Sequence, residues 1–209
     1  MELRTASNIR IIDITRSREW QKYLYKCLAP MPYRKYSNRQ EYLQKAIPEG
    51  FHKKILTIDG EVVGSIEYAP APASGYPITG DNLIVMNCVW VLRKAKGRNF
   101  GKLLVEDMTK SEGATGGFAT IALENHWSPW FRKNQIEKLG FKPLGSFRVT
   151  HKTKHKDQSF KVYLMWMPAT ETSKPPTWNK QQLLRGETFC IAHPLYRPKT
   201  CKEAILKAK

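Results

Sequence analysis

The segment from residue 83 to residue 104 constrains the fold of this chain more than any other. Residues 83–92 are apolar on both alternating faces, which is typical of a central β-strand covered on both sides. One face has Leu83, Val85, Val89 and Val91, and the other has Ile84, Met86, Cys88, Trp90 and Leu92. A basic loop with two glycines follows, and then a helix with an apolar stripe of Phe100, Leu103, Leu104 and Met108. This order of strand, loop and helix predicts an α/β protein.

The loop at residues 96–101 has the features of a phosphate-binding site. The first N–H groups of a helix lack partners within the helix and lie at the positive end of its dipole. Gly97 and Gly101 allow the backbone to approach a bulky anion closely. Additional positive charge comes from Lys94, Lys96, Arg98 and Lys102. The alternative is an ordinary strand–turn–helix with solvated lysines; the loop matches neither a Walker loop nor a Gly-x-Gly-x-x-Gly fingerprint.

The rest of the pattern predicts a mixed sheet with helices on both faces. Asp59-Gly60 lies between two apolar runs and predicts a hairpin of strands at 54–59 and 61–68. Gly140 predicts the end of a helix at 131–139. Further strands are expected at 9–14, 118–123, 147–150 and 160–167, and further helices after Ser17 and Ser37.

The composition is that of a globular chain with a strong positive charge. Of the 209 residues, 41% are hydrophobic and 11% aromatic, and the formal net charge is +17. More than half of the excess charge lies after residue 141. Such a field favours anionic partners, nucleic acid among them, but no RRM, KH, helix-turn-helix or zinc-finger signature is present.

Targeting and metal-binding signals are absent from the sequence. No run of about 18 apolar residues and no hydrophobic signal core occur, so we expect a cytoplasmic protein without membrane contact. The four cysteines are scattered, and no metal site is expected. Cys190, His193 and Cys201 lie close in the sequence, and the interpretation as ordinary residues of a tail is favoured over a partial metal site.

The segment 88–104 resembles the acetyl-CoA loop of the GNAT N-acetyltransferases. That family has Gln/Arg-x-x-Gly-x-Gly/Ala between a bulged central strand and a helix. Aligned on Gly101, Lys96 takes the Gln/Arg place and Asn99 takes the place of the first glycine. The stretch Ile136-Glu-Lys-Leu-Gly-Phe141 resembles the family's Tyr-x-x-x-Gly-Phe helix end. The resemblance spans residues 8–167, and the segment 167–178 is similar to the YoaP-type branch of this family.

The resemblance implies a fold and a domain division. The implied α/β (α+β) fold is a mixed, mostly antiparallel twisted sheet of about seven strands with helices on both faces. The GNAT-like domain would cover residues 1–168, and a basic C-terminal extension would cover 169–209. Pro175-Pro176 and the lack of apolar alternation predict that the extension lies outside the sheet. Its apolar residues are expected to dock it on the core.

The resemblance also implies a co-substrate and the residues that bind it. Acetyl-CoA would donate its acetyl group to a primary amine, by direct attack in a ternary complex and without a metal. Pantetheine would lie along the splayed strand at 88–91, and pyrophosphate on the N–H groups of the loop 96–101. The implied cofactor-binding residues are Val89, Val91, Lys96, Gly97, Arg98, Asn99, Phe100, Gly101, Lys102 and Asn125.

Direct attack by a neutral amine needs a base, and the departing thiolate needs an acid. Glu124, Glu67 and His126 are the candidate bases, although strand-end glutamates are often solvated and single histidines often structural. The Tyr that often serves as the acid in the family is replaced here by Ile136, so the acid is missing or comes from elsewhere. An aromatic cluster either holds a cationic or planar acceptor or packs a helix on the sheet; its members are Trp127, Trp130 and Phe131.

Two other functions stay open at this point. The charge also fits a basic nucleic-acid-binding module, although no motif supports one. The absent Tyr also fits a GNAT fold that binds CoA without catalysis. The sequence does not identify the acceptor amine.

Overall fold

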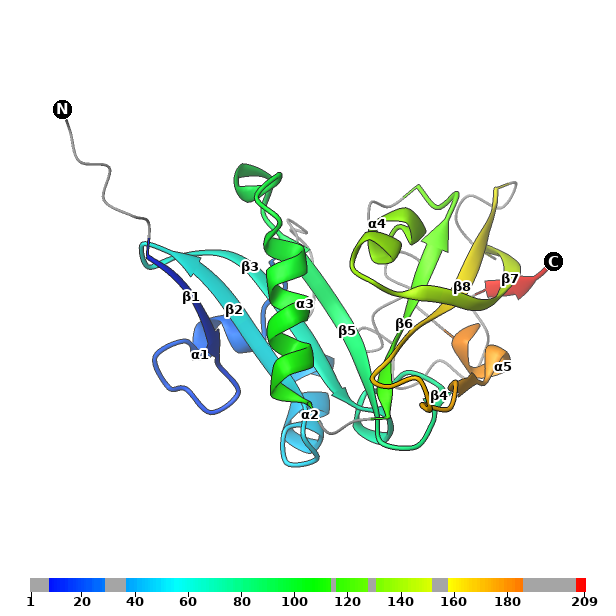
Figure 1. Cartoon of the computed structure of the whole chain (residues 1–209), viewed down its shortest axis with the longest axis horizontal. Helices are drawn as coiled ribbons and strands as arrows, with labels where there is room; N and C mark the ends of the chain where they lie inside the picture. The colour runs from blue at the N-terminus through cyan, green and yellow to red at the C-terminus, as the bar shows by residue number, and fades with distance from the viewer. Residues whose placement is uncertain (1–7, 29–36, 114–115, 128–130, 152–157, 186–205) are drawn as a thin grey trace.

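The computed structural model describes residues 8–28, 37–113, 116–127, 131–151, 158–185 and 206–209. Its main sheet has eight strands in the order β1-β2-β3-β5-β6-β8-β7-β10 (Figure 1). Neighbouring strands of this sheet run antiparallel except β5 and β6, which are parallel. The expected mixed, mostly antiparallel sheet with helices is therefore confirmed.

The N-terminal half of the sheet is a set of antiparallel strands built around the predicted hairpin. Its strands are β1 (Ile9–Asp13), β2 (His52–Ile58), β3 (Glu61–Pro70) and β5 (Leu83–Val91). Asp59 and Gly60 have φ of 50° and 82°, as the tight turn of a two-residue hairpin requires. Two helices connect β1 to β2, namely α1 (Gln21–Leu24) and α2 (Ser37–Ala46), and α1 is much shorter than the pattern predicted.

The C-terminal half of the sheet follows helix α3 (Phe100–Ser111). Its strands are β6 (Gly117–Glu124), β7 (Lys142–His151), β8 (Ser159–Pro168) and β10 (Leu206–Ala208). Helix α4 (Lys133–Lys138) connects β6 to β7, and Gly140 has a φ of 100° just after it. This positive φ matches the helix stop predicted at that glycine.

Helices cover both faces of the N-terminal half of the sheet, as its alternating side chains show. On β2, Ile55 packs in a cluster with Leu43 and Ala46 of α2, whereas Leu56 belongs to the cluster that contains Leu104 of α3. The predicted stripe of α3 is wrong at Leu103, which is 36% exposed. Phe100, Leu104, Val105 and Met108 are the buried residues of that helix, because its register on the sheet turns Leu103 outward.

A bulge in β5 changes which residues share a face. Glu67 of β3 pairs with Cys88, but the next residue, Tyr68, pairs with Met86, so Asn87 is the extra residue of β5. The predicted faces of this strand are therefore wrong beyond Met86. Val85 shares its face with Cys88 and Trp90, whereas Met86 shares the other face with Val89 and Val91.

The end of the chain takes part in the main sheet, which corrects the expectation that the extension lies outside it. Strand β10 pairs with the outer edge of β7, where Leu206 is opposite His151. Leu206 and Leu183 of α5 (Lys180–Leu183) are buried in the larger core. Sequence pattern did not indicate this strand because three residues carry no detectable alternation. The division of the chain at residue 168 stays a prediction.

A second, two-stranded sheet joins the linker to the main body. β9 (Thr177–Trp178) pairs with β4 (Ile78–Thr79), which follows the short 3-10 helix η1 (Ala71–Ala73). Cys190, His193 and Cys201 lie outside the described residues. In the described ranges, no helix combines the length and the apolar character needed to cross a membrane.

Candidate active site

The two halves of the sheet diverge at the junction of β5 and β6. The parallel pairing covers Leu83–Val85 of β5 and Gly117–Ala119 of β6. Beyond it the strands separate, with β5 running toward α3 and β6 toward α4 (Figure 1). The point where the two strands separate, at Met86 and Thr120, is called the vertex. There the Thr120 hydroxyl donates a hydrogen bond of 2.8 Å to the Met86 carbonyl. The edge of β5 from Asn87 to Val91 has no partner strand on this side among the described residues.

Asn87 lies in the bulge directly beyond this vertex and is fully buried. Its side-chain amide donates a hydrogen bond of 2.8 Å to the carbonyl of Ser74, which follows η1. Its side-chain oxygen has no hydrogen-bond partner in the part of the chain that the structure describes. The bulge is thus anchored from one side by a side chain rather than by the sheet itself.

The loop between β5 and α3 exposes the N-terminus of the helix. A 3-10 turn, η2 (Arg93–Ala95), leads to Gly97 with a φ of 82°. Asn99, the residue before the helix, is left-handed with a φ of 56°, and its side chain does not cap the helix. The first amide that bonds back into the helix is that of Leu103, to the Asn99 carbonyl. The N–H groups before it are therefore available to an external acceptor.

The two glycines of the loop differ in whether the backbone conformation of the protein requires glycine at that position. Gly97 has a positive φ that favours glycine whatever the surrounding space. Gly101 has no such φ, and an added Cβ would lie 3.6 Å from Leu139 Cδ2, an ordinary contact. Internal packing therefore does not explain the glycine at 101.

Two cations of the loop are left without an acidic partner. Lys94 forms an ion pair with Glu61, and Lys102 Nζ lies 3.8 Å from Glu106. Lys96 and Arg98 are exposed, and neither pairs with a carboxylate among the described residues. The Arg98 guanidinium instead lies 4.8 Å from the centre of the Phe100 ring. The helix N-terminus therefore carries uncompensated positive charge.

Among the other predicted cofactor residues, the valines and Asn125 lie on the facing edges of the divergence. Val89 and Val91 are half-buried near the end of β5, on the face that α3 covers. Asn125 follows β6 directly, is exposed and has a φ of 61°. Phe100 is buried in the core below the loop, so its side chain is structural while its amide belongs to the exposed helix start.

Glu124 ends β6 and is held by two neighbours on β8. The Tyr163 hydroxyl donates to its carboxylate at 3.1 Å, and Lys161 Nζ lies 3.4 Å away. Partial burial raises the pKa of Glu124, but the Tyr163 hydrogen bond and the Lys161 charge outweigh it and hold the pKa below its ordinary value. Glu124 is therefore an accessible, ionised carboxylate at neutral pH.

Glu67 is placed differently from Glu124, inside the protein. Its carboxylate binds Arg39 of α2 at 2.6 Å and Lys53 of β2 at 2.8 Å, and all three side chains are buried. Arg39 also donates to the Leu24 carbonyl, and Lys53 to the Lys26 carbonyl. Burial lowers the pKa of Lys53, and the adjacent carboxylate offsets part of this effect. Glu67 thus joins α2 and the segment after α1 to the sheet.

His126 lies among aromatic rings, two residues after β6. It is 9% exposed, stacks on Trp127 at 4.0 Å between ring centres, and meets the Phe160 ring at 4.6 Å. His151 of β7 lies 4.8 Å from the Trp127 ring. Phe131 is buried in the core, and Trp130 lies outside the described residues. In this arrangement Trp127 and Phe131 pack the end of β6.

Comparison with known proteins identifies the fold. A ribosomal-protein-S18-alanine N-acetyltransferase from Escherichia coli superimposes with a TM-score of 0.55 at 10% identity, covering 80% of this chain and 97% of that one. An acetyltransferase assigned to the GNAT family from Desulfovibrio desulfuricans gives 0.53 at 11% identity, covering 78% and 100%. An assigned streptothricin acetyltransferase from Bacillus anthracis, solved with acetyl coenzyme A, gives 0.53 at 15% identity, covering 78% and 99%.

The chain has the GNAT fold. No protein-family model matches the sequence, and the search of curated proteins found no match. At these identities the likeness establishes the fold, and the branch within it is not identified.

Sequence reasoning missed Tyr163, whose hydroxyl donates a hydrogen bond to Glu124. Ile136, at the place of the family's usual Tyr, is buried in the core and presents no polar group. Tyr163 lies on β8, its ring 5.3 Å from Lys133 Nζ at the start of α4. The register of β6 and β8, which pairs Ala122 with Tyr163, could not be read from the sequence, so the Glu124–Tyr163 contact had no signal there.

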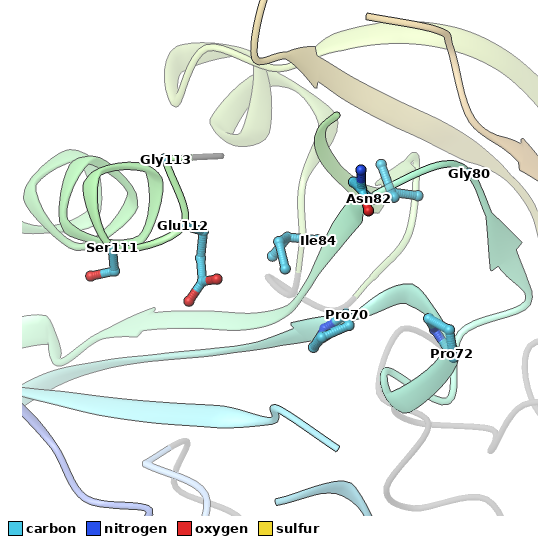
Figure 2. A pocket seen from close by; sticks show the side chains of 9 residues that line it. Pro70, Pro72, Gly80, Asn82, Ile84, Ser111, Glu112 and Gly113 are labelled. Atoms are coloured by element: carbon cyan, nitrogen blue, oxygen red, sulfur yellow. The ribbon is translucent and has the colours of Figure 1, made fainter. Parts of the chain in front are cut away.

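A pocket of about 590 Å³ opens at the opposite end of α3 from the loop (Figure 2). Its lining includes Pro70, Pro72, Asn82, Ile84 and Glu112. None of the predicted site residues of the GNAT fold lines it, so this pocket is not the candidate active site. Within the described ranges, no group of three or more His, Cys, Asp and Glu side chains is arranged to hold a metal ion.

Proposed function

We propose that this protein is an acetyl-CoA-dependent N-acyltransferase that moves an acetyl group to a primary amine. The reaction is direct attack of the amine on the thioester carbonyl in a ternary complex. Cofactor and acceptor are bound together, and no covalent enzyme intermediate forms. The chain's positive charge favours an acidic or phosphorylated acceptor.

The divergence of β5 from β6, ending at the open N-terminus of α3, carries this proposal. It combines the edge of β5 beyond Val85, along which the described residues form no further ladder with β6, with the exposed helix start in the loop 96–101. The edge offers hydrogen bonds to the amides of pantetheine, and the helix N-terminus offers N–H groups and positive charge to pyrophosphate. Lys96 and Arg98, which lack carboxylate partners among the described residues, supply further charge. The neighbouring fold from Bacillus anthracis, solved with acetyl coenzyme A, also supports it.

Glu124 is the best of the three candidate bases. It is ionised and accessible at the end of β6, which borders the divergence. Glu67 is buried and already forms ion pairs with two buried cations. His126 is packed against two aromatic rings. In the proposed mechanism Glu124 accepts the amine proton, directly or through water, and Tyr163 positions its carboxylate.

Acetyl-CoA binding tests the site. Gly101→Glu puts a side chain and a negative charge where pyrophosphate would sit, so we expect it to abolish binding measured by calorimetry. Gly145→Glu in β7 is the matched control, because an added Cβ there meets nothing within 4 Å and the charge change is the same. Equal affinity in both variants would remove the loop from the cofactor site.

Acetyl transfer across a panel of small amines and acidic peptides tests the reaction itself. Thiol release from acetyl-CoA that depends on the added amine is the expected result, and Glu124→Gln should lower it. Binding of acetyl-CoA without transfer to any acceptor would favour the non-catalytic GNAT fold. Steeply salt-dependent binding to random RNA, without acetyl-CoA binding, would favour the nucleic-acid module.

A further inference from the structure

At the vertex where β5 and β6 separate, a side-chain hydrogen bond connects the two strands in place of a backbone hydrogen bond of the sheet. After the third parallel pair, the next ladder position would join Met86 to Thr120. There the Thr120 hydroxyl, instead of a backbone amide, bonds to the Met86 carbonyl at 2.8 Å. Thr120 and Met86 are both fully buried. This hydrogen bond is therefore the last link between the two halves before they part.

Directly beyond the vertex, the side chain of Asn87 holds the bulge of β5. The side-chain amide of Asn87 donates to the Ser74 carbonyl, while its buried side-chain oxygen has no partner among the described residues. Ser74 is itself buried, and its hydroxyl bonds to the Ala71 carbonyl. The floor of the divergence is thus defined by two polar side chains on opposite strands, Thr120 on β6 and Asn87 on β5.

The length of β5 beyond the vertex relates this floor to the cofactor. From Met86 to Val91, the strand extends about 16 Å at roughly 3.3 Å per residue. The pantetheine arm of CoA has a comparable length between its pyrophosphate and its sulfur. A cofactor anchored at the loop 96–101 therefore brings its thioester close to the floor of the divergence.

We propose that Thr120 is a positioning and specificity-determining residue, whose bond to Met86 fixes the floor of the acyl site and restricts the donor to short acyl groups. This inference rests on the proposed cofactor site and adds the acyl chain as the feature that is selected. Without the hydroxyl, β5 and β6 can part by one further residue pair, and the floor recedes. A longer acyl chain then fits where only acetyl did.

The test compares dissociation constants of CoA, acetyl-CoA and butyryl-CoA by calorimetry, so no acceptor is needed. For the natural chain we expect acetyl-CoA to bind roughly tenfold more tightly than butyryl-CoA, the scale on which a closed pocket rejects extra methylenes. Thr120→Val keeps the shape and removes the bond, and it should bring this ratio close to one. Thr120→Ser keeps a hydroxyl and should retain the ratio.

Thr57→Val is the matched control. Thr57 is also a buried strand threonine, but its hydroxyl faces the Arg10 carbonyl between β2 and β1, far from the vertex. Thr57→Val makes the same chemical change in the same sheet and should keep the acyl preference. If Thr120→Val does not fold, Thr120→Ala removes the same hydroxyl and is expected to give the same loss of preference.

Two results would overturn the inference. One is butyryl-CoA binding as tightly as acetyl-CoA to the natural chain. The other is a folded Thr120 variant without the hydroxyl that keeps the natural ratio. Failure of the proposed cofactor site is distinguishable, because then CoA itself does not bind to the natural chain, and failure of acetyl transfer alone leaves this binding test intact.

Discussion

Two of the candidate bases have different places in this protein. One holds the two helices after β1 to the sheet, and the other borders the divergence of β5 and β6. Glu67 is the residue that holds the helices. Its carboxylate lies between the buried cations of Arg39 and Lys53, whose other donors bind the carbonyls of Leu24 and Lys26. Such a cluster tolerates the loss of one charge poorly, because the remaining charges stay buried without compensation.

Glu67→Gln is therefore expected to destabilise the protein by about 3–5 kcal/mol. Chemical denaturation followed by circular dichroism measures the change. Glu61→Gln, which breaks the exposed pair with Lys94, should cost at most about 0.5 kcal/mol. A stable Glu67→Gln variant that loses acetyl transfer would instead return Glu67 to the list of catalytic candidates.

Glu124 borders the divergence, and its pKa can be measured directly. Tyr163→Phe removes the hydrogen bond that helps to hold the pKa of Glu124 below its ordinary value, so the pKa should rise. Because the folded-state pKa lies below the unfolded one, this carboxylate stabilises the fold above its unfolded pKa. That contribution disappears as the pH falls through the folded-state pKa.

Carboxyl NMR titration measures the pKa shift. Tyr23→Phe on α1, which is remote from Glu124, serves as the control. No change in the Tyr163→Phe titration would mean that the charges of Lys161 and Lys133 set the pKa of Glu124. In the natural protein, a rise of activity between pH 6 and 9 would then report deprotonation of the acceptor amine and not of Glu124.

At the scale of elements, the sequence predicted what depends on local residue types. Asp59-Gly60 specified the hairpin turn, Gly140 the end of α4, and the apolar run at 83–92 the central strand. The loop 96–101 was also predicted to precede α3. These features follow from backbone preferences and periodicity, which neighbours in sequence carry.

Features set by contacts between distant residues could not be predicted in the same way. The bulge at Asn87 depends on the register of β3 against β5 and on the carbonyl of Ser74. The separate environments of Glu67 and Glu124 depend on α2 and β8, respectively. Both glutamates end or interrupt apolar runs, so the sequence pattern alone did not distinguish them.

Asn99 provides a prediction for the start of α3. Its left-handed φ is tolerated by Asn and Gly and strained for a β-branched residue. Asn99→Gly should retain acetyl-CoA binding and change the stability by no more than about 1 kcal/mol. Asn99→Val should cost about 1–2 kcal/mol and weaken binding, as measured by thermal unfolding and calorimetry. Equal behaviour of the two variants would show that the loop adopts another conformation in solution.

At the scale of the whole molecule, residues 206–208 add the outermost strand of the sheet next to β7. Leu206 is buried, its amide bonds to the Leu184 carbonyl, and β10 pairs with Val149–His151 at the outer edge of β7. A free edge strand exposes unpaired backbone groups to other molecules. Residues 206–208 therefore stabilise the fold and cover this part of the β7 edge.

Deleting residues 206–209 should lower the free energy of unfolding by roughly 2–4 kcal/mol, the scale for losing a buried leucine. It should also promote self-association through β7. Calorimetry and analytical ultracentrifugation measure the two effects. The double variant Lys207→Ala and Lys209→Ala keeps the strand and should remain monodisperse if the natural chain is. An unchanged transition temperature after the deletion would show that β10 contributes little.

The short parallel junction has a consequence for motion. In the described sheet, three residue pairs, the Thr120–Met86 hydrogen bond and a hydrogen bond from the Gly116 amide to the Asn82 carbonyl join β5 to β6. Each half is tied internally by long antiparallel ladders. We expect amide hydrogens at this junction to exchange with deuterium sooner than those of β2–β3 or β7–β8. A bound cofactor that contacts both halves would restrain their separation, so saturating CoA should slow exchange at the junction most of all. Uniform slowing across the chain would instead indicate that the two halves open as a single unit.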